Sequence, residues 1–177
     1  SHPATMYRKN VICKFGGYKK EALHAEDYDL WLRVMSNYKV HNIDEVILLY
    51  RQHDKKVSFN YYPQQLISTF IAQKKFMLTK NNINFMLSDG IYSMKHFKDI
   101  QVSQEEIRIF SFDWINQIIG MCQHNKLSIN VLSKAIENNI QYLDFTNTNK
   151  EHLISIINNL CQTNKTLCLE QLIKKII

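Results

Sequence analysis

From residue 61 to residue 177, apolar residues recur at helical spacing. Residues such as Ile107, Phe110 and Trp114 lie three to four positions apart, which places them on one face of a helix. Glycine and proline interrupt this stretch only three times, at Pro63, Gly90 and Gly120. The pattern predicts five or six helices in these residues, packed as a bundle or a short helical array.

Capping residues indicate where these helices begin. Ser103, followed three residues later by Glu106, has the form of a capping box, in which each side chain accepts a bond from the other residue's backbone N–H. Pro63 suits a first helical turn, where a backbone N–H has no intrahelical partner. Other Ser and Thr residues can cap further helices, namely Ser128, Thr148 and Thr166.

Residues 1–60 change periodicity often and are predicted as a mixed α/β segment. Residues 11–15 form a predicted short helix that Gly16 and Gly17 end. A longer helix is predicted from Glu26, because apolar residues follow it at helical spacing and acidic residues crowd its first turn.

Two strands are also predicted, a short one at residues 4–8 and a buried one at the continuous apolar run 46–51. The resulting expectation is an α+β protein, mostly α. A small α/β part, residues 1–60, is followed by a helical part, residues 61–177.

Composition and charge exclude several classes of protein. Hydrophobic residues make up 45% and charged residues 21%, as in soluble globular domains, and no apolar stretch approaches the roughly 18 residues of a membrane-spanning helix. The net charge of +6 is spread evenly, with 10 basic and 7 acidic residues in 1–60 and 12 and 9 in 61–177. Without a basic patch, specific nucleic-acid binding is not expected. Weak attraction to an anionic membrane surface fits the charge distribution about as well as nucleic-acid binding does.

The cysteines show no spacing typical of a zinc site or a C-x-x-C pair. They are Cys13, Cys122, Cys161 and Cys168. Reduced thiols in a cytoplasmic protein are the interpretation that follows.

Candidate chemistry lies almost entirely before residue 60, and the first candidate is the carboxylate of Asp27. At a helix start it either complements the helix dipole or, held ionised, accepts a proton from a substrate. Asp27 and Asp29 also form a D-x-D string, but residues i and i+2 of a helix point about 200° apart. The two carboxylates are therefore not expected to chelate one metal ion together.

Two further candidates follow the predicted buried strand and the first helix. Arg51 and His53 share one face of an extended chain, where they could bind a pyrophosphate and its metal or simply be surface residues at a strand end. Gly16 and Gly17 either stop a helix or form a turn that a ligand approaches closely.

Taken together, four segments resemble the second half of a family 2 glycosyltransferase of GT-A fold. They are His2-Pro3-Ala4-Thr5-Met6-Tyr7-Arg8-Lys9, Gly16-Gly17-Tyr18, Ala25-Glu26-Asp27-Tyr28-Asp29-Leu30-Trp31-Leu32-Arg33 and Tyr50-Arg51-Gln52-His53. Their order and spacing match the acceptor-side part of that family over residues 2–58. The resemblance implies that residues 1–60 are the C-terminal, acceptor-side part of a GT-A domain and that residues 61–177 are a helical appendage.

The resemblance also implies an activity, the inverting transfer of a hexose-like sugar from a nucleotide-sugar to an acceptor hydroxyl. Asp27 would be the general base and Glu26 its neighbour at the acceptor. Gly16 and Gly17 would border the donor sugar, with Arg51 as a further substrate-binding residue. His53 would bind a divalent Mg or Mn ion in the full-length enzyme.

The expected partners are a nucleotide-sugar donor and a glycan or lipid-linked acceptor, with a bacterial surface polysaccharide as the suggested product. The expected place is the cytoplasm, with peripheral association at the inner face of the membrane as a further option. A Q-x-x-R-W motif of processive synthases is missing, which favours a non-processive enzyme.

The nucleotide-binding half of the family, with its D-x-D, would precede Ser1. A piece limited to these residues is therefore expected to be inactive and to bind no metal ion. The alternative hypothesis is a helical protein-interaction or membrane-association module without catalysis.

Overall fold

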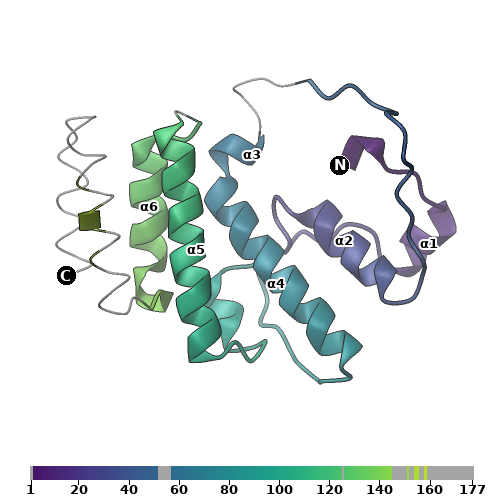
Figure 1. Ribbon diagram of the computed structural model, residues 1–177. Helices are drawn as coiled ribbons and strands as arrows, with labels where there is room; N and C mark the ends of the chain where they lie inside the picture. Colours follow the sequence, from purple (N-terminus) through teal and green to yellow (C-terminus); the bar gives the residue numbers. More distant parts are fainter. Residues whose placement is uncertain are drawn as a thin grey trace. The chain divides into compact units, whose positions relative to one another are not determined.

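The computed structural model describes residues 2–51, 57–124 and 126–144, together with residues 151, 154, 155 and 158. The α-helices are α1 (Lys9–Lys14), α2 (Glu26–Met35), α3 (Val57–Asn60), α4 (Tyr62–Lys80), α5 (Gln104–Gln123) and α6 (Ile129–Asn139) (Figure 1). Short 3₁₀ helices are η1 (His2–Ala4), η2 (Met94–Phe97) and η3 (Ile140–Tyr142). Over these described ranges there is no β-strand.

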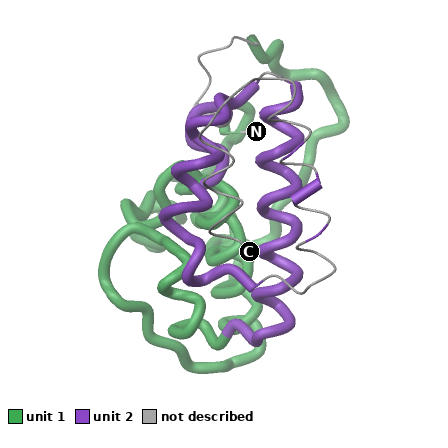
Figure 2. The backbone as a smooth tube through the Cα atoms, turned by 90° about the vertical axis from the view of Figure 1, so that its left-hand side faces the viewer, with its two compact units in different colours: residues 1–56, 64–101 green, residues 57–63, 102–177 purple. Residues whose placement is uncertain are grey.

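The chain divides into two compact units, each of which combines separate stretches of sequence (Figure 2). The first unit contains residues 1–56 and 64–101, and the second contains residues 57–63 and 102–177. By contacts, residues 64–101 thus group with the N-terminal segment. The predicted division of the chain into a GT-A part, residues 1–60, and a helical appendage, residues 61–177, is not tested by this grouping and stays a prediction.

The core of the first unit combines one face each of α2 and α4 with buried residues in and around η2. Leu30 and Val34 lie one turn apart on α2, Ile67 and Ile71 lie one turn apart on α4, and all four are buried. The long connection after α4 returns to the start of the unit, where the Tyr92 backbone N–H donates to a carbonyl at residue 21 over 2.7 Å.

The second unit is built on α5 and α6, which lie side by side (Figure 1). Trp114 and Ile118 of α5 and Leu132 and Ile136 of α6 are at most 1% exposed. The indole Nε1–H of Trp114 donates to the carbonyl of Pro63 at 2.9 Å, so its polar atom is satisfied in the core.

The helix starts that were predicted from capping residues are confirmed where the structure describes them. The Ser103 hydroxyl accepts from Glu106 N–H at 3.2 Å, and the Glu106 carboxylate accepts from Ser103 N–H at 2.9 Å. Ser128 is the N-cap of α6, although its side chain makes no capping bond. The predicted starts at Thr148 and Thr166 lie outside the described residues.

The two predicted strands are wrong for the described part of the chain. Residues 4–8 contain the end of η1 and an irregular segment, and residues 46–51 are irregular and exposed. Val46 and Leu49 are 87% and 91% exposed. A strand forms only where a neighbour accepts and donates its backbone hydrogen bonds, and an apolar run does not supply that neighbour. Without a strand in the described residues, the structure does not confirm the α+β class or the GT-A relationship, and both stay predictions.

None of the described helices combines the length and the apolar character that crossing a membrane would require.

Candidate functional site

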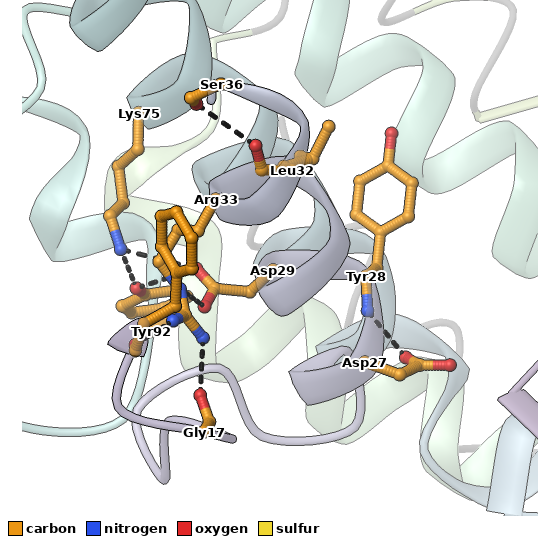
Figure 3. A network of polar contacts seen from close by, with 10 residues as sticks. Gly17, Asp27, Tyr28, Asp29, Leu32, Arg33, Ser36, Lys75 and Tyr92 are labelled. Carbon is orange, nitrogen blue, oxygen red and sulfur yellow. Dashed lines mark hydrogen bonds and ion pairs between the residues drawn. The ribbon is translucent and has the colours of Figure 1, made fainter. Parts of the chain in front are cut away.

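The first turn of α2 carries Asp27 (Figure 3). Its Oδ1 accepts from the backbone N–H of Tyr28 at 2.8 Å, and its side chain is 31% exposed. The N-cap, Ala25, provides no side-chain cap, and Asp27 is one of three acidic residues in this turn, with Glu26 and Asp29. The Asp27 side chain remains partly accessible to solvent.

A chain of polar contacts leads from Asp27 to aromatic residues at distant positions of the sequence. The Nδ1 of His2 lies 3.9 Å from Asp27 Oδ2, and its Nε2 lies 2.8 Å from the hydroxyl of Tyr18. Partial burial raises the pKa of Tyr18, and its hydrogen bond to Tyr7 and the charges of Asp27 and Glu26 add to this. The first, second and third segments of the resemblance therefore meet at one place.

His2 and Tyr18 are site residues that the sequence reasoning did not single out. Both lie in segments quoted for the resemblance, but no spacing rule connects residues 2, 18 and 27, which come from η1, an irregular segment and a helix start. Glu26, the first residue of α2, is half-buried.

The helix stop predicted at Gly16 and Gly17 is confirmed. Gly16 has φ +71° and Gly17 has φ +63°, a left-handed conformation that residues with a Cβ rarely adopt. The Gly17 N–H donates to the Ile12 carbonyl and the Gly16 N–H to the Cys13 carbonyl, each at 3.0 Å, which is the Schellman arrangement of a helix C-terminus. Whether the turn also borders a donor sugar stays a prediction.

A buried carboxylate, Asp29, lies two residues from Asp27 and is 2% exposed. Its Oδ2 accepts from Arg33 Nε at 2.8 Å, and its Oδ1 lies 3.3 Å from Lys75 Nζ and 3.4 Å from the Tyr92 hydroxyl (Figure 3). The Lys75 amine also donates to the Tyr92 hydroxyl. Burial is the main cause that lowers the pKa of Lys75, and the charge of Asp29 opposes it.

Asp27 and Asp29 have different partners, as the geometry of residues i and i+2 in a helix requires. In the part of the chain that the structure describes, no three His, Cys, Asp or Glu side chains form a group that could hold a metal ion. Arg51 is exposed at the end of the irregular segment, and His53 lies outside the described residues. The predicted pairing of Arg51 and His53 is thus not tested.

The comparisons with known proteins point to one enzyme class. The chain is 41% identical over 68 residues to the O-antigen biosynthesis glycosyltransferase WbnJ of Escherichia coli, an alignment that covers 35% of this chain and 26% of WbnJ. The chain thus spans about a quarter of the length of this curated relative. No family model matches the chain, and no solved structure matches it. The chain contains a region related to a glycosyltransferase.

Proposed function

We propose that this chain is the acceptor-side part of an inverting glycosyltransferase of family 2 and GT-A fold. The enzyme would transfer a sugar from a nucleotide-sugar to a hydroxyl of a glycan or a lipid-linked glycan in the synthesis of a bacterial surface polysaccharide. The region related to WbnJ supports the enzyme class, and the name of that relative suggests the kind of product.

The observation that carries the proposal is the carboxylate of Asp27, held in the first turn of α2 and accessible from solvent. A general base must be ionised and must reach the proton that it takes. Asp27 lies in the first turn of a helix, where the helix dipole complements an acidic side chain, and its side chain is partly exposed to solvent. Asp29, which is buried and bound to two cationic side chains, lacks the access to a substrate proton that a base needs.

The proposed reaction is a single displacement. The acceptor hydroxyl attacks the anomeric carbon of the donor sugar, its proton passes to the Asp27 carboxylate, and the nucleoside diphosphate leaves with the electron pair of the broken C–O bond. Glu26 lies beside Asp27 at the acceptor, Gly16 and Gly17 border the donor sugar, and Arg51 contacts the donor. This assignment rests on the resemblance, since the described geometry places only Glu26 and Asp27 in one helical turn.

The resemblance also implies a Mg or Mn ion bound by His53. The described residues alone do not fit such an ion, because they contain no suitable cluster of ligands. The proposed steps therefore use the side chains of this chain alone.

The test is Asp27→Asn in the full-length protein. The amide is close in shape to the carboxylate but cannot accept the proton, so kcat should fall by about 10²–10⁴-fold while the affinity for the donor stays within about twofold. Steady-state rates with a panel of nucleotide-sugars identify the donor and give kcat. Titration calorimetry with that donor then measures its affinity.

Asp113→Asn is the matched control, because Asp113 is an exposed carboxylate of α5. It should leave both quantities unchanged. If Asp27→Asn kept more than about a tenth of the wild-type turnover, Asp27 would only complement the helix dipole.

A further inference from the structure

The guanidinium of Arg33 connects α2 to the turn that follows α1 and uses all three of its nitrogens to do so. Its Nε donates to Asp29 at 2.8 Å, its Nη1 to the carbonyl of Phe15 at 2.5 Å and its Nη2 to the carbonyl of Gly17 at 2.8 Å (Figure 3). A guanidinium is planar and its donors have fixed directions, so these three bonds define the orientation of the group. The turn at the end of α1 is thereby tied to α2.

Asp29, the carboxylate that Arg33 binds, has further partners of its own. Asp29 is buried, and Lys75 of α4 and the hydroxyl of Tyr92 bind the oxygen that Arg33 leaves unused. A buried carboxylate requires such compensation of its charge. The position of Asp29, and with it that of Arg33, is therefore set by residues that lie 46 and 63 positions further along the chain.

We infer that Arg33 is a positioning residue for the proposed transfer, and that it sets the distance from the Gly16–Gly17 turn to the carboxylate of Asp27. Arg33 fixes the turn at one end of this distance, because it binds the carbonyl of Gly17. The other end, Asp27, lies on the same helix as Asp29 and Arg33.

The inference rests on the proposed function, in which the turn borders the donor sugar and Asp27 takes the acceptor proton. The distance between them then governs how the two reacting groups meet. A displacement of about 1 Å in such an arrangement can lower the rate by 10²-fold.

The experiment is Arg33→Lys in the full-length protein. Lysine keeps the positive charge beside Asp29 but cannot replace three donors in one plane. Because Lys75 still compensates Asp29, the fold should be retained while the turn is released. We expect kcat to fall by about 10–100-fold and the KM for the donor to rise, with the KM for the acceptor within about twofold of wild type.

Hydrogen exchange of the backbone amides provides a second measurement that does not depend on activity. The Gly16 and Gly17 amides, which bond within the turn, should exchange faster in Arg33→Lys, whereas the amides in the interior of α2 should be unchanged. Arg108→Lys is the matched control, because Arg108 of α5 also pairs with carboxylates, Glu105 and Asp144, and should change neither measurement.

A kcat and a donor KM within twofold of wild type would overturn the inference. A second result would also overturn it: amide exchange that rises equally in the turn and in α2 while both KM values stay unchanged. Such a result would mean that the variant is partly unfolded. A wild-type protein that transfers no sugar would instead refute the proposed function and with it the catalytic part of the inference, while the exchange data would still report whether Arg33 holds the turn.

Discussion

At the scale of single residues, two carboxylates two positions apart have opposite surroundings. Asp27 is partly exposed beside His2, and Asp29 is buried between Arg33 and Lys75. Successive positions of a helix face different directions, so one turn of α2 presents one acidic group to solvent and directs another into the unit. The exposed group is suited to chemistry and the buried group to structure.

The buried cluster predicts unequal costs for removing its members. Asp29→Asn leaves Arg33 and Lys75 without their counter-charge and should lower the free energy of unfolding by about 3–5 kcal/mol. Lys75→Met leaves Asp29 bonded to Arg33 and Tyr92 and removes a buried amine, so the change should be below about 1.5 kcal/mol. Urea unfolding followed by circular dichroism measures both values.

Exposed residues provide the controls for this comparison. Asp113→Asn and Lys80→Met make the same chemical changes at exposed positions of α5 and α4 and should each lie within about 0.5 kcal/mol of wild type. Equal losses of unfolding free energy for Asp29→Asn and Lys75→Met would contradict this prediction. They would show that the Asp29–Lys75 ion pair, and not the charge balance of the whole cluster, determines how much the cluster stabilises the protein.

At the scale of elements, the ends of helices are defined by short-range chemistry. α1 ends in two glycines with positive φ, and α5 begins with a reciprocal capping box. Each feature needs only residues within about one turn, which is why sequence patterns located them.

The two serine N-caps of the second unit form a matched pair. Ser103→Ala removes a hydroxyl that accepts from Glu106 N–H and should lower the free energy of unfolding by about 1 kcal/mol. Ser128→Ala removes a hydroxyl that makes no capping bond and should cost only a few tenths of that amount. Thermal and urea unfolding of both variants measure the difference, and equal losses would mean that the bond at Ser103 contributes nothing.

At the scale of the whole molecule, the sequence order and the spatial grouping differ. Residues 64–101 belong with the N-terminal segment, and hydrogen bonds explain why. The Ser68 hydroxyl donates to the carbonyl of Leu23 at 2.8 Å, and the Gln65 amide donates to the carbonyl of His24 at 3.0 Å. α4 thus stabilises the loop that leads into α2.

The lowered pKa of Lys75 makes the stability of the whole protein depend on pH in a defined direction. Folded Lys75 loses its proton at a lower pH than the unfolded chain, whose lysines have pKa values near 10.5. In the alkaline range between these two pKa values the unfolded state binds more protons, so the free energy of unfolding should rise with pH. Below the lowered pKa the cost of the buried charge is present in full.

The measurement compares wild type with Lys75→Met at about pH 7 and about pH 9, one unit below the ordinary tyrosine pKa of about 10. The difference in unfolding free energy between the two proteins should shift in favour of wild type at the higher pH. Tyr92 acts in the opposite sense above about pH 10, because burial and the charge of Asp29 raise its pKa and the folded state then keeps a proton that the unfolded state loses. A difference that stays constant with pH would contradict the lowered pKa of Lys75.

The sequence by itself determined the described α-helices of at least ten residues and the helix stop at Gly16 and Gly17. Periodicity, caps and glycine conformation depend on interactions within one or two turns, and these interactions are encoded in adjacent residues. The sequence also singled out Asp27, since a carboxylate at a helix start is a local feature.

Only the tertiary structure decided what residues 46–51 do and which side chains meet. An apolar run has the composition of a strand, but its backbone bonds depend on a neighbour that no local pattern specifies. In the same way, the contact of His2 with Asp27 and the bonds that join Arg33 to the glycine turn and Lys75 to Asp29 connect residues 16 to 46 positions apart. Such contacts depend on how helices pack, and the packing follows from the burial of whole faces rather than from any short motif.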